Sequence, residues 1–245
     1  MASRYAYASH LPTPYVRLLT LVGDGESFHG TLEEFPKDDL PKFDAISWCW
    51  PSRTGNHSAS FRCNGQPFLV SPQLYELLSS LSQKNALSPV RIWLDYICIN
   101  QDNIEEKNEH VSRMHEIYIL AQKVIVWLGM PENGSDMVMD PQRISELNTA
   151  LRLLPTCSIA QTVTVSSLPL AEDPIWRAIG RLCDRDWFYR TWIIQEICLA
   201  NKAELLCGKW YLGWDDFADL VQNISRVGLA SICRGARSAG TIRPD

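Results

Sequence analysis

The sequence predicts an α/β domain with a mostly parallel sheet, helices on both faces and an added β-hairpin. Apolar runs of strand length alternate along the chain with segments of helical periodicity, which is the pattern of strands joined by crossover helices. The run KVIVWL at residues 123–128 is almost wholly apolar, as in a central strand that is covered on both faces. The pair Asn64-Gly65 between apolar flanks predicts the hairpin.

The N-terminal part contains three expected strands. Residues 15–22, YVRLLTLV, form the first, and a shorter strand is expected near residues 28–32 within a polar segment. The run FDAISW at residues 43–48 is apolar and lies between prolines, as expected of a buried strand. Residues 51–60 are small and polar, and we interpret them as a loop that serves as a mobile lid.

The hairpin at residues 61–70 leads into a helix. Ser71 is expected to cap this helix, with a proline at its first helical position. Its buried face is expected to carry four leucines at helical spacing: Leu74, Leu77, Leu78 and Leu81. After Pro89, residues 91–97 form the second expected core strand.

A further helix is expected to begin at Asp102, because Glu105 three residues later gives the spacing of a capping box. Its predicted buried face carries Ile104, Val111, Met114, Tyr118 and Ala121. The opposite face is interpreted as solvated surface and carries Glu105, Glu106, Lys107 and Glu109. The strand at residues 123–128 follows.

The C-terminal part is predicted to contain four helices and one strand. Asp173 is expected to cap one of the helices, with a proline at its first position. Residues 155–173 are rich in serine and threonine and show no clear period. The other expected elements are helices at residues 142–154, 191–200 and 214–227, a strand at residues 203–207, and a turn or hairpin at residues 208–212.

Composition bounds the class of protein. The chain has 245 residues, of which 46% are apolar, and this suits one packed domain. The formal net charge is −5 with scattered basic residues, so no nucleic-acid partner is expected. No apolar run is long enough to span a bilayer, and the eight cysteines without C-x-x-C pairs indicate reduced thiols. We therefore expect a soluble cytoplasmic domain over residues 1–233 and a flexible tail over residues 234–245.

Polar and aromatic side chains end or follow the two expected core strands: Ser47, Trp48, Trp50, Asp95, Asn100 and Gln101. Ligands of open α/β sheets bind at the carboxyl ends of the strands, so these are candidate ligand-binding residues. Each has a structural alternative. The tryptophans could pack in the core, Asp95 could bond nearby backbone amides, and the two amide side chains could tie their loop together.

Glu196 lies in the otherwise apolar segment TWIIQEICLA. A carboxylate in such surroundings is costly unless it is paired, hydrogen-bonded or facing a cleft. We interpret Glu196 as a pocket-facing acid, with an ion pair to Arg190 or Arg185, or a place on the helix surface, as the alternatives. Arg190 and Arg53 could meet a pyrophosphate, or both could lie on the surface.

Three other chemistries are disfavoured. Cys98 with His110 or His115 lacks the arrangement of a nucleophile and its base. Histidines and cysteines are dispersed without ligand spacing, so no metal site is expected. The absence of a G-x-x-x-x-G-K-[ST] segment argues against a P-loop nucleoside triphosphatase.

Three sequence blocks, in order, resemble the fungal heterokaryon incompatibility (HET) domain. They are FDAISWCW at residues 43–50, RIWLDYICINQDNIEEKNEHVSRMHEIYILAQKVIVWLG at residues 91–129, and RDWFYRTWIIQEICLANKAELLCG at residues 185–208. The family's first block has a glycine after its last tryptophan, where this chain has Pro51. Proteins of this family often carry further domains, so the chain is expected to be either a fragment or a short member.

The resemblance implies a function. HET domains trigger cell death when incompatible fungal cells fuse. The family is similar to TIR domains, which have a flavodoxin-like fold, and some TIR domains cleave NAD at the nicotinamide–ribose bond with a glutamate in a W-x-x-x-E spacing. Trp192 and Glu196 have that spacing here.

The resemblance therefore implies a nucleotide-binding cleft with Glu196 as the catalytic residue and Arg190 and Trp192 as ligand contacts. NAD would be the substrate, no cofactor would be required, and the domain would form a homo-oligomer on activation and act with an unknown protein partner. The alternative is a non-enzymatic module that triggers death through self-association.

Overall fold

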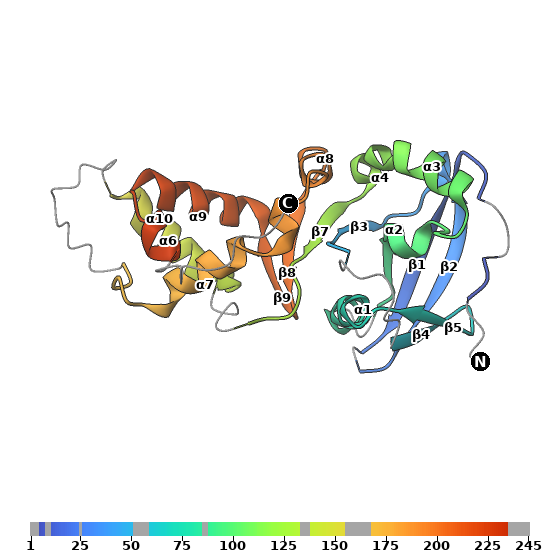
Figure 1. Ribbon diagram of the computed structural model, residues 1–245, viewed down its shortest axis with the longest axis horizontal. Coiled ribbons are helices and arrows are strands. Elements are labelled where there is room, and N and C mark those ends of the chain that lie inside the picture. Colours follow the sequence, from blue (N-terminus) through green and yellow to red (C-terminus); the bar gives the residue numbers. More distant parts are fainter. Residues whose placement is uncertain are drawn as a thin grey trace, which may run out of the picture.

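The computed structural model describes residues 5–7, 11–24, 26–50, 59–84, 88–132, 138–154 and 168–234. Within these residues, nine strands form one sheet in the order β5-β4-β2-β1-β6-β3-β7-β8-β9 (Figure 1). The strands are β1 Tyr15–Gly23, β2 Phe28–Pro36, β3 Asp44–Ser47, β4 Ala59–Cys63, β5 Gln66–Val70, β6 Val90–Trp93, β7 Lys123–Trp127, β8 Ala203–Cys207 and β9 Trp210–Gly213.

The sheet is mixed, so the expectation of a mostly parallel sheet is wrong, although the α/β class is confirmed. Four of the neighbouring strand pairs are parallel and four are antiparallel. Strands β6, β3, β7 and β8 run parallel to one another at the centre of the sheet. Short connections reverse the chain between β1 and β2, β4 and β5, and β8 and β9, and such connections produce antiparallel pairs.

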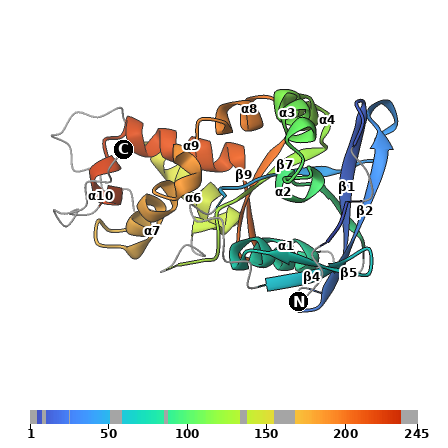
Figure 2. The same cartoon turned by 45° about the vertical axis from the view of Figure 1, so that its right-hand side comes forward.

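The helices have the following bounds: α1 Pro72–Lys84, α2 Asp95–Cys98, α3 Ile104–Ser112, α4 Met114–Leu120, α6 Pro141–Arg152, α7 Pro174–Cys183, α8 Ile193–Cys198, α9 Trp214–Arg226 and α10 Ala230–Arg234. Two 3-10 turns, η1 Lys37–Asp39 and η2 Asp186–Tyr189, complete the set. Helices α6, α7, α9 and α10 gather beyond β8 and β9, at the end of the molecule opposite β1 and β2 (Figure 1 and Figure 2).

The central strands are covered on both faces, as expected. Three successive residues of β3 are buried, and so are four successive residues of β7. Because successive side chains of a strand point to opposite faces, burial of all of them requires packing on both sides. Helix α1 contacts β1 and β4, and α9 contacts β8 and β9.

The hairpin and the helix after it are confirmed. Asn64 and Gly65 both have positive φ, at 49° and 76°, which is the backbone that a two-residue hairpin turn requires. Ser71 Oγ accepts a hydrogen bond from the backbone N–H of Leu74 at 3.2 Å. The predicted stripe of four leucines on α1 is wholly buried.

The helix expected to begin at Asp102 differs from the prediction. Its N-cap is Asn103, whose side chain accepts from the backbone N–H of Glu106 at 3.1 Å. The helix is interrupted at Arg113, which separates α3 from α4. Because of this break, α3 and α4 do not share one continuous buried face. Ile104 and Val111 of α3 are exposed, and Glu106, which was expected on the solvated face, is buried.

Two further expected elements are shorter than predicted. Strand β6 ends at Trp93, and Asp95 begins the short helix α2. Helix α8 covers Ile193–Cys198 only, and Ile194 on it is exposed, so the segment at residues 191–200 is only partly buried.

Several expectations fall outside the described residues. The expected lid at residues 51–60 lies there except for its last two residues, as does Arg53. The same holds for residues 155–167 and for residues 235–245 of the expected tail.

Candidate functional site

The carboxyl ends of the central parallel strands meet at one edge of the sheet. Of the parallel strands, β3 comes first in the chain, and the next two, β6 and β7, lie on opposite sides of it. The strand order therefore reverses at β3. A reversal of this kind opens the crevice in which doubly wound α/β proteins bind ligands. Ser47 is the last residue of β3, and Asp95 begins α2 directly beyond β6.

Glu196 of α8 reaches this edge from far along the chain. Its Oε2 accepts a hydrogen bond from Ser47 Oγ, and Trp187 Nε1 donates to the same Ser47 oxygen at 2.6 Å. Arg190 holds both carboxylate oxygens, with Nη2–Oε1 at 3.2 Å and Nη1–Oε2 at 3.3 Å. The side chain of Glu196 is 2% exposed, so this is a buried carboxylate paired with a charged partner.

Tyr118 of α4 completes the surroundings of Glu196. The phenol is buried close to the Glu196 carboxylate. Burial places the pKa of Tyr118 well above its ordinary value, and the nearby carboxylates of Glu196 and Asp95 raise it further. Tyr118 therefore stays neutral throughout the physiological pH range.

Asp95 fixes the two tryptophans that follow β3. Its Oδ1 accepts from Trp48 Nε1 at 3.1 Å and from the backbone N–H of Tyr96 at 2.7 Å, and its Oδ2 accepts from Trp50 Nε1 at 3.0 Å. Burial raises the pKa of Asp95, while these three hydrogen bonds oppose the rise. Asp95 thus orients both indoles and also bonds a backbone amide of the next turn.

The two carboxylates belong to one electrostatic site. The positive charge of Arg190, paired with Glu196, also opposes the rise in the pKa of Asp95 that burial causes. Burial raises the pKa of the Cys49 thiol, which lies near the same arginine and near Glu196. The structure therefore brings together most of the residues that the sequence singled out: Ser47, Trp48, Trp50, Asp95, Arg190 and Glu196.

Three predicted ligand-binding residues lie apart from this cluster. Gln101 Nε2 donates to the backbone carbonyls of Asp95 and Ile99 at 2.9 and 3.2 Å, so it ties the loop after α2. The Asn100 side chain accepts from the backbone N–H of Asp102 at 3.1 Å in the same loop. Trp192 is exposed at the start of α8.

Sequence reasoning missed Trp187 and the role of Tyr118. Trp187 lies within the third sequence block, but nothing local distinguishes it from the other tryptophans as a hydrogen-bond donor to Ser47. Tyr118 was predicted only as part of a buried helical face. A buried indole or phenol needs a polar partner, so each of these residues was expected to have one. The identity of the partner could not be inferred, because it lies far away in the sequence.

A cleft of about 400 Å³ opens at the carboxyl ends of β3 and β7. Trp48 and Trp187 contribute to its wall, and Glu196 is not among the described residues that line it. Trp187 of this wall donates a hydrogen bond to Ser47, and Ser47 donates one to Glu196. The Glu196 carboxylate therefore lies behind the wall and not at its surface. The volume is within the usual range for a small-molecule site.

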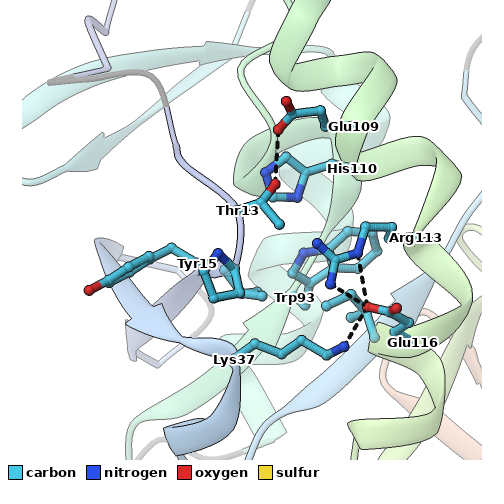
Figure 3. A pocket seen from close by; sticks show the side chains of 11 residues that line it. Thr13, Tyr15, Lys37, Trp93, Glu109, His110, Arg113 and Glu116 are labelled. Atoms are coloured by element: carbon cyan, nitrogen blue, oxygen red, sulfur yellow. Dashed lines mark hydrogen bonds and ion pairs between the residues drawn. The ribbon is translucent and has the colours of Figure 1, made fainter.

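A much smaller hollow, of about 20 Å³, lies between the segment before β1 and helices α3 and α4 (Figure 3). Glu116 accepts from Lys37 Nζ at 2.6 Å and from Arg113 Nε at 3.2 Å, and Glu109 accepts from Thr13 Oγ1 at 3.0 Å. This volume holds one water molecule, so the hollow is not an organic ligand site.

His110 at this hollow is expected to make stability pH-dependent. Burial lowers its pKa, assisted by Arg17 and Arg113 and opposed by Glu106 and Glu109. The unfolded chain then binds a proton that the folded chain does not, so the free energy of unfolding falls as pH drops below about 6.5 toward the folded pKa.

Urea denaturation at several pH values between 5.5 and 7.5, about one unit either side of the ordinary histidine pKa, checks this expectation. His110→Gln should flatten the fall, whereas His115→Gln, on an exposed neighbour, should leave it unchanged. An identical slope for His110→Gln and the unaltered chain would contradict the assignment.

None of the helices described is long and apolar enough to cross a membrane. Within the same part of the chain, no group of three or more His, Cys, Asp or Glu side chains is placed to hold a metal ion. The seven cysteines described are free thiols.

The fold and the site define an α/β domain with a buried acidic cluster and a ligand-sized cleft at the reversal of its strand order. The family model described as heterokaryon incompatibility protein (HET) matches residues 43–196, and the chain belongs to this family. This match confirms the resemblance found in the sequence. The likeness to TIR domains stays a prediction.

The chain is also 29% identical, over 231 residues, to heterokaryon incompatibility protein 6, OR allele, of Neurospora crassa. The alignment covers 80% of this chain and 34% of that protein, so the chain spans about a third of its relative's length. No solved structure matches the chain.

Proposed function

We propose that this chain is the effector domain of a fungal incompatibility system and that it cleaves NAD at the nicotinamide–ribose bond. Its family and its Neurospora relative, whose name refers to heterokaryon incompatibility, support the biological role. One observation carries the chemical part. Glu196, Ser47 and Arg190 converge with Asp95 at the carboxyl edge of the parallel strands, beside the cleft.

In this proposal, Glu196 stabilises the positive charge that develops on the ribose as nicotinamide departs. The C1′–N bond breaks with its electron pair going to neutral nicotinamide, water adds to C1′, and one proton is released. Ser47 fixes the carboxylate in place, and Arg190 pairs with it until substrate enters. A partly desolvated carboxylate interacts more strongly with a developing cation than one in water.

The arrangement of the central strands supports a flavodoxin-like and TIR-like core. Numbered along the chain, the parallel strands β3, β6, β7 and β8 are the first to fourth, and they lie side by side in the order 2-1-3-4. Flavodoxin-like sheets have the order 2-1-3-4-5. The antiparallel strands β1, β2, β4, β5 and β9 are then additions to this core.

Because Glu196 is enclosed in the structure, substrate has to displace one of its neighbours. Arg190 is the more accessible member of the pair, with 20% of its side chain exposed. We propose that activation moves Arg190 or the wall of the cleft and so opens the carboxylate to the ribose. Activation by assembly into a homo-oligomer, alone or with a protein partner, would supply this movement.

Nicotinamide release tests the proposal. Purified protein at high concentration, incubated with NAD, should release nicotinamide, and Glu196→Gln should release it at least about a hundredfold more slowly. Circular dichroism and thermal melting must show that the variant is folded, since Glu196 is buried. Gln195→Ala, next to it on the exposed side of α8, is the matched control and should keep the activity. Release at the same rate by folded Glu196→Gln, or none from the unaltered chain in any oligomeric state, would refute the enzymatic proposal.

A second candidate function is a non-enzymatic module that signals through protein contacts. It is favoured by the exposure of three large apolar side chains near Glu196: Tyr189, Trp192 and Ile194. Exposed aromatic residues of this kind are enriched at protein interfaces. Under this alternative, cell death in a fungal expression assay would be lost with Trp192→Ser but would survive Glu196→Gln, whereas the enzymatic proposal expects Glu196→Gln to abolish it.

A further inference from the structure

The short helix α10 packs closely against α7 (Figure 2). A Cβ placed on Gly180 of α7 would clash with the carbonyl oxygen of Cys233 on α10 and would lie 3.6 Å from its Cα. Any side chain at position 180 would therefore push the two helices apart. Glycine at this position lets the backbone of Cys233 lie directly on the surface of α7.

A second thiol lies on the same face of α7. Cys183 follows Gly180 by three residues, and residues three apart on a helix are neighbours on one face. Cys183 and Cys233 both line the hollow of about 350 Å³ between α7, α9 and α10, whose walls are mostly apolar. Neither cysteine is fully buried, so a small reagent that enters the hollow reaches both.

The two thiols are also close enough to interact electrostatically. Burial is the main cause that raises the pKa of Cys183 to about 11, and the nearby groups of Cys233 and Asp184 add to the rise. Burial also raises the pKa of Cys233. Both groups are therefore neutral at physiological pH, unlike the thiolates of catalytic cysteines. Among the described residues, no third His, Cys, Asp or Glu is placed with them to hold a metal ion.

We propose that Cys183 and Cys233 form a disulfide, which joins α10 covalently to α7 when the protein meets an oxidised low-molecular-weight disulfide such as oxidised glutathione. The bond requires Cα atoms about 4.4–6.8 Å apart, and the close backbone approach at Gly180 favours such a separation. In a reducing compartment both residues stay thiols. The inference stands without the proposed function, which uses neither thiol.

Two exchange steps form the bond. One cysteine thiolate attacks a sulfur of oxidised glutathione, so the glutathione S–S bond breaks, a mixed disulfide forms and one glutathione thiolate leaves. The second cysteine thiolate then attacks the protein sulfur of the mixed disulfide, which forms the Cys183–Cys233 bond and releases the second glutathione. The two protons lost by the cysteines end on the two glutathione molecules. Two protein thiols are thus oxidised and one molecule of oxidised glutathione is reduced.

The raised pKa values determine how fast the link forms and how well it lasts. Only a small fraction of either thiol is ionised at neutral pH, so exchange should be slow and should accelerate about tenfold per pH unit. Reduction of the link has to release a thiolate that burial disfavours, so the disulfide resists reduction once it has formed. The pair is therefore suited to a slow and lasting response to oxidation.

Peptide mapping tests the inference, because trypsin releases the two cysteines in separate short peptides. Reduced protein is incubated with millimolar oxidised glutathione at about pH 8, where exchange is faster, and is then quenched with acid, alkylated and digested. Mass spectrometry should find residues 182–185 linked to residues 227–234 in most molecules. Cys183→Ser should leave residues 227–234 carrying one glutathione. Cys198→Ser removes an exposed thiol of α8 and should leave the link unchanged.

A glycine variant tests the geometry. Gly180→Ala should slow formation of the linked peptide at least about fivefold, because the added methyl group pushes Cys233 away from α7 and lowers the effective concentration of its thiol. Ser231→Ala, at an exposed position of α10, is the control and should leave the rate unchanged. No linked peptide in the unaltered protein, glutathione retained on both cysteines, or an unchanged rate in Gly180→Ala would overturn the inference.

Discussion

Replacing Glu106 with glutamine is expected to lower the free energy of unfolding by about 3–5 kcal/mol, the usual cost of breaking a buried ion pair from one side. Glu106 is fully buried, and its Oε1 lies 2.5 Å from Nη1 of Arg17, whose side chain is also buried. It also accepts from the backbone N–H groups of Leu11 at 3.1 Å and Asn100 at 2.8 Å. A glutamine would turn an amide donor toward groups that are all donors, and Arg17 would keep the partly exposed Glu34 as its carboxylate partner in place of the buried one.

Urea denaturation followed by circular dichroism measures this change, provided that both chains unfold in two states. Glu105→Gln is the control, because Glu105 is the exposed neighbour, and it should stay within about 0.5 kcal/mol of the unaltered chain. A result for Glu106→Gln within the range of the control would show that the Arg17–Glu106 pair does not hold the N-terminal segment to α3.

The second large effect concerns the pair at the site and is asymmetric. Arg190→Met should lower the free energy of unfolding by about 3–5 kcal/mol, because it leaves the carboxylate of Glu196 buried without its cation. Glu196→Gln should cost only about 1–2 kcal/mol, because the Arg190 side chain is partly exposed and water can solvate it. The more exposed member of the pair is thus the more costly one to remove.

Denaturation of the two single variants and of the double variant measures this asymmetry. The double variant should be more stable than Arg190→Met alone, since no buried charge is left without a partner. Arg177→Met, at an exposed position of α7, controls for loss of an arginine and should have little effect. A cost for Glu196→Gln equal to that for Arg190→Met would contradict the asymmetry.

Much of the site was predictable because of one geometric rule. Parallel strands end at a common edge, so residues that follow β3 and β6 in sequence had to lie near each other. Ser47, Trp48, Trp50 and Asp95 were singled out on that basis, and the structure brings them together. Glu196 was singled out because an apolar segment cannot bury a lone carboxylate, and the structure supplies its partners.

The rest could not be predicted because it depends on contacts between distant segments. The sequence of a strand does not state the direction of its neighbour, so the antiparallel pairing of β1 with β6 left no local signal. Glu106 was placed on a solvated face because a single helix was assumed through Arg113. The break there, together with the packing of Leu11 and Arg17 on α3, buries it instead.

The enzymatic site can be tested by a crystal structure of the protein with an NAD analogue whose nicotinamide–ribose bond cannot be cleaved. We expect the nicotinamide ring to lie in the cleft at the carboxyl ends of β3 and β7. We also expect the Glu196 carboxylate to be released from Arg190 and to lie about 3 Å from the ribose. An analogue bound elsewhere, such as the hollow of about 350 Å³ between α7, α9 and α10, would contradict the account. So would a bound analogue with Glu196 still enclosed by Ser47, Arg190 and Tyr118.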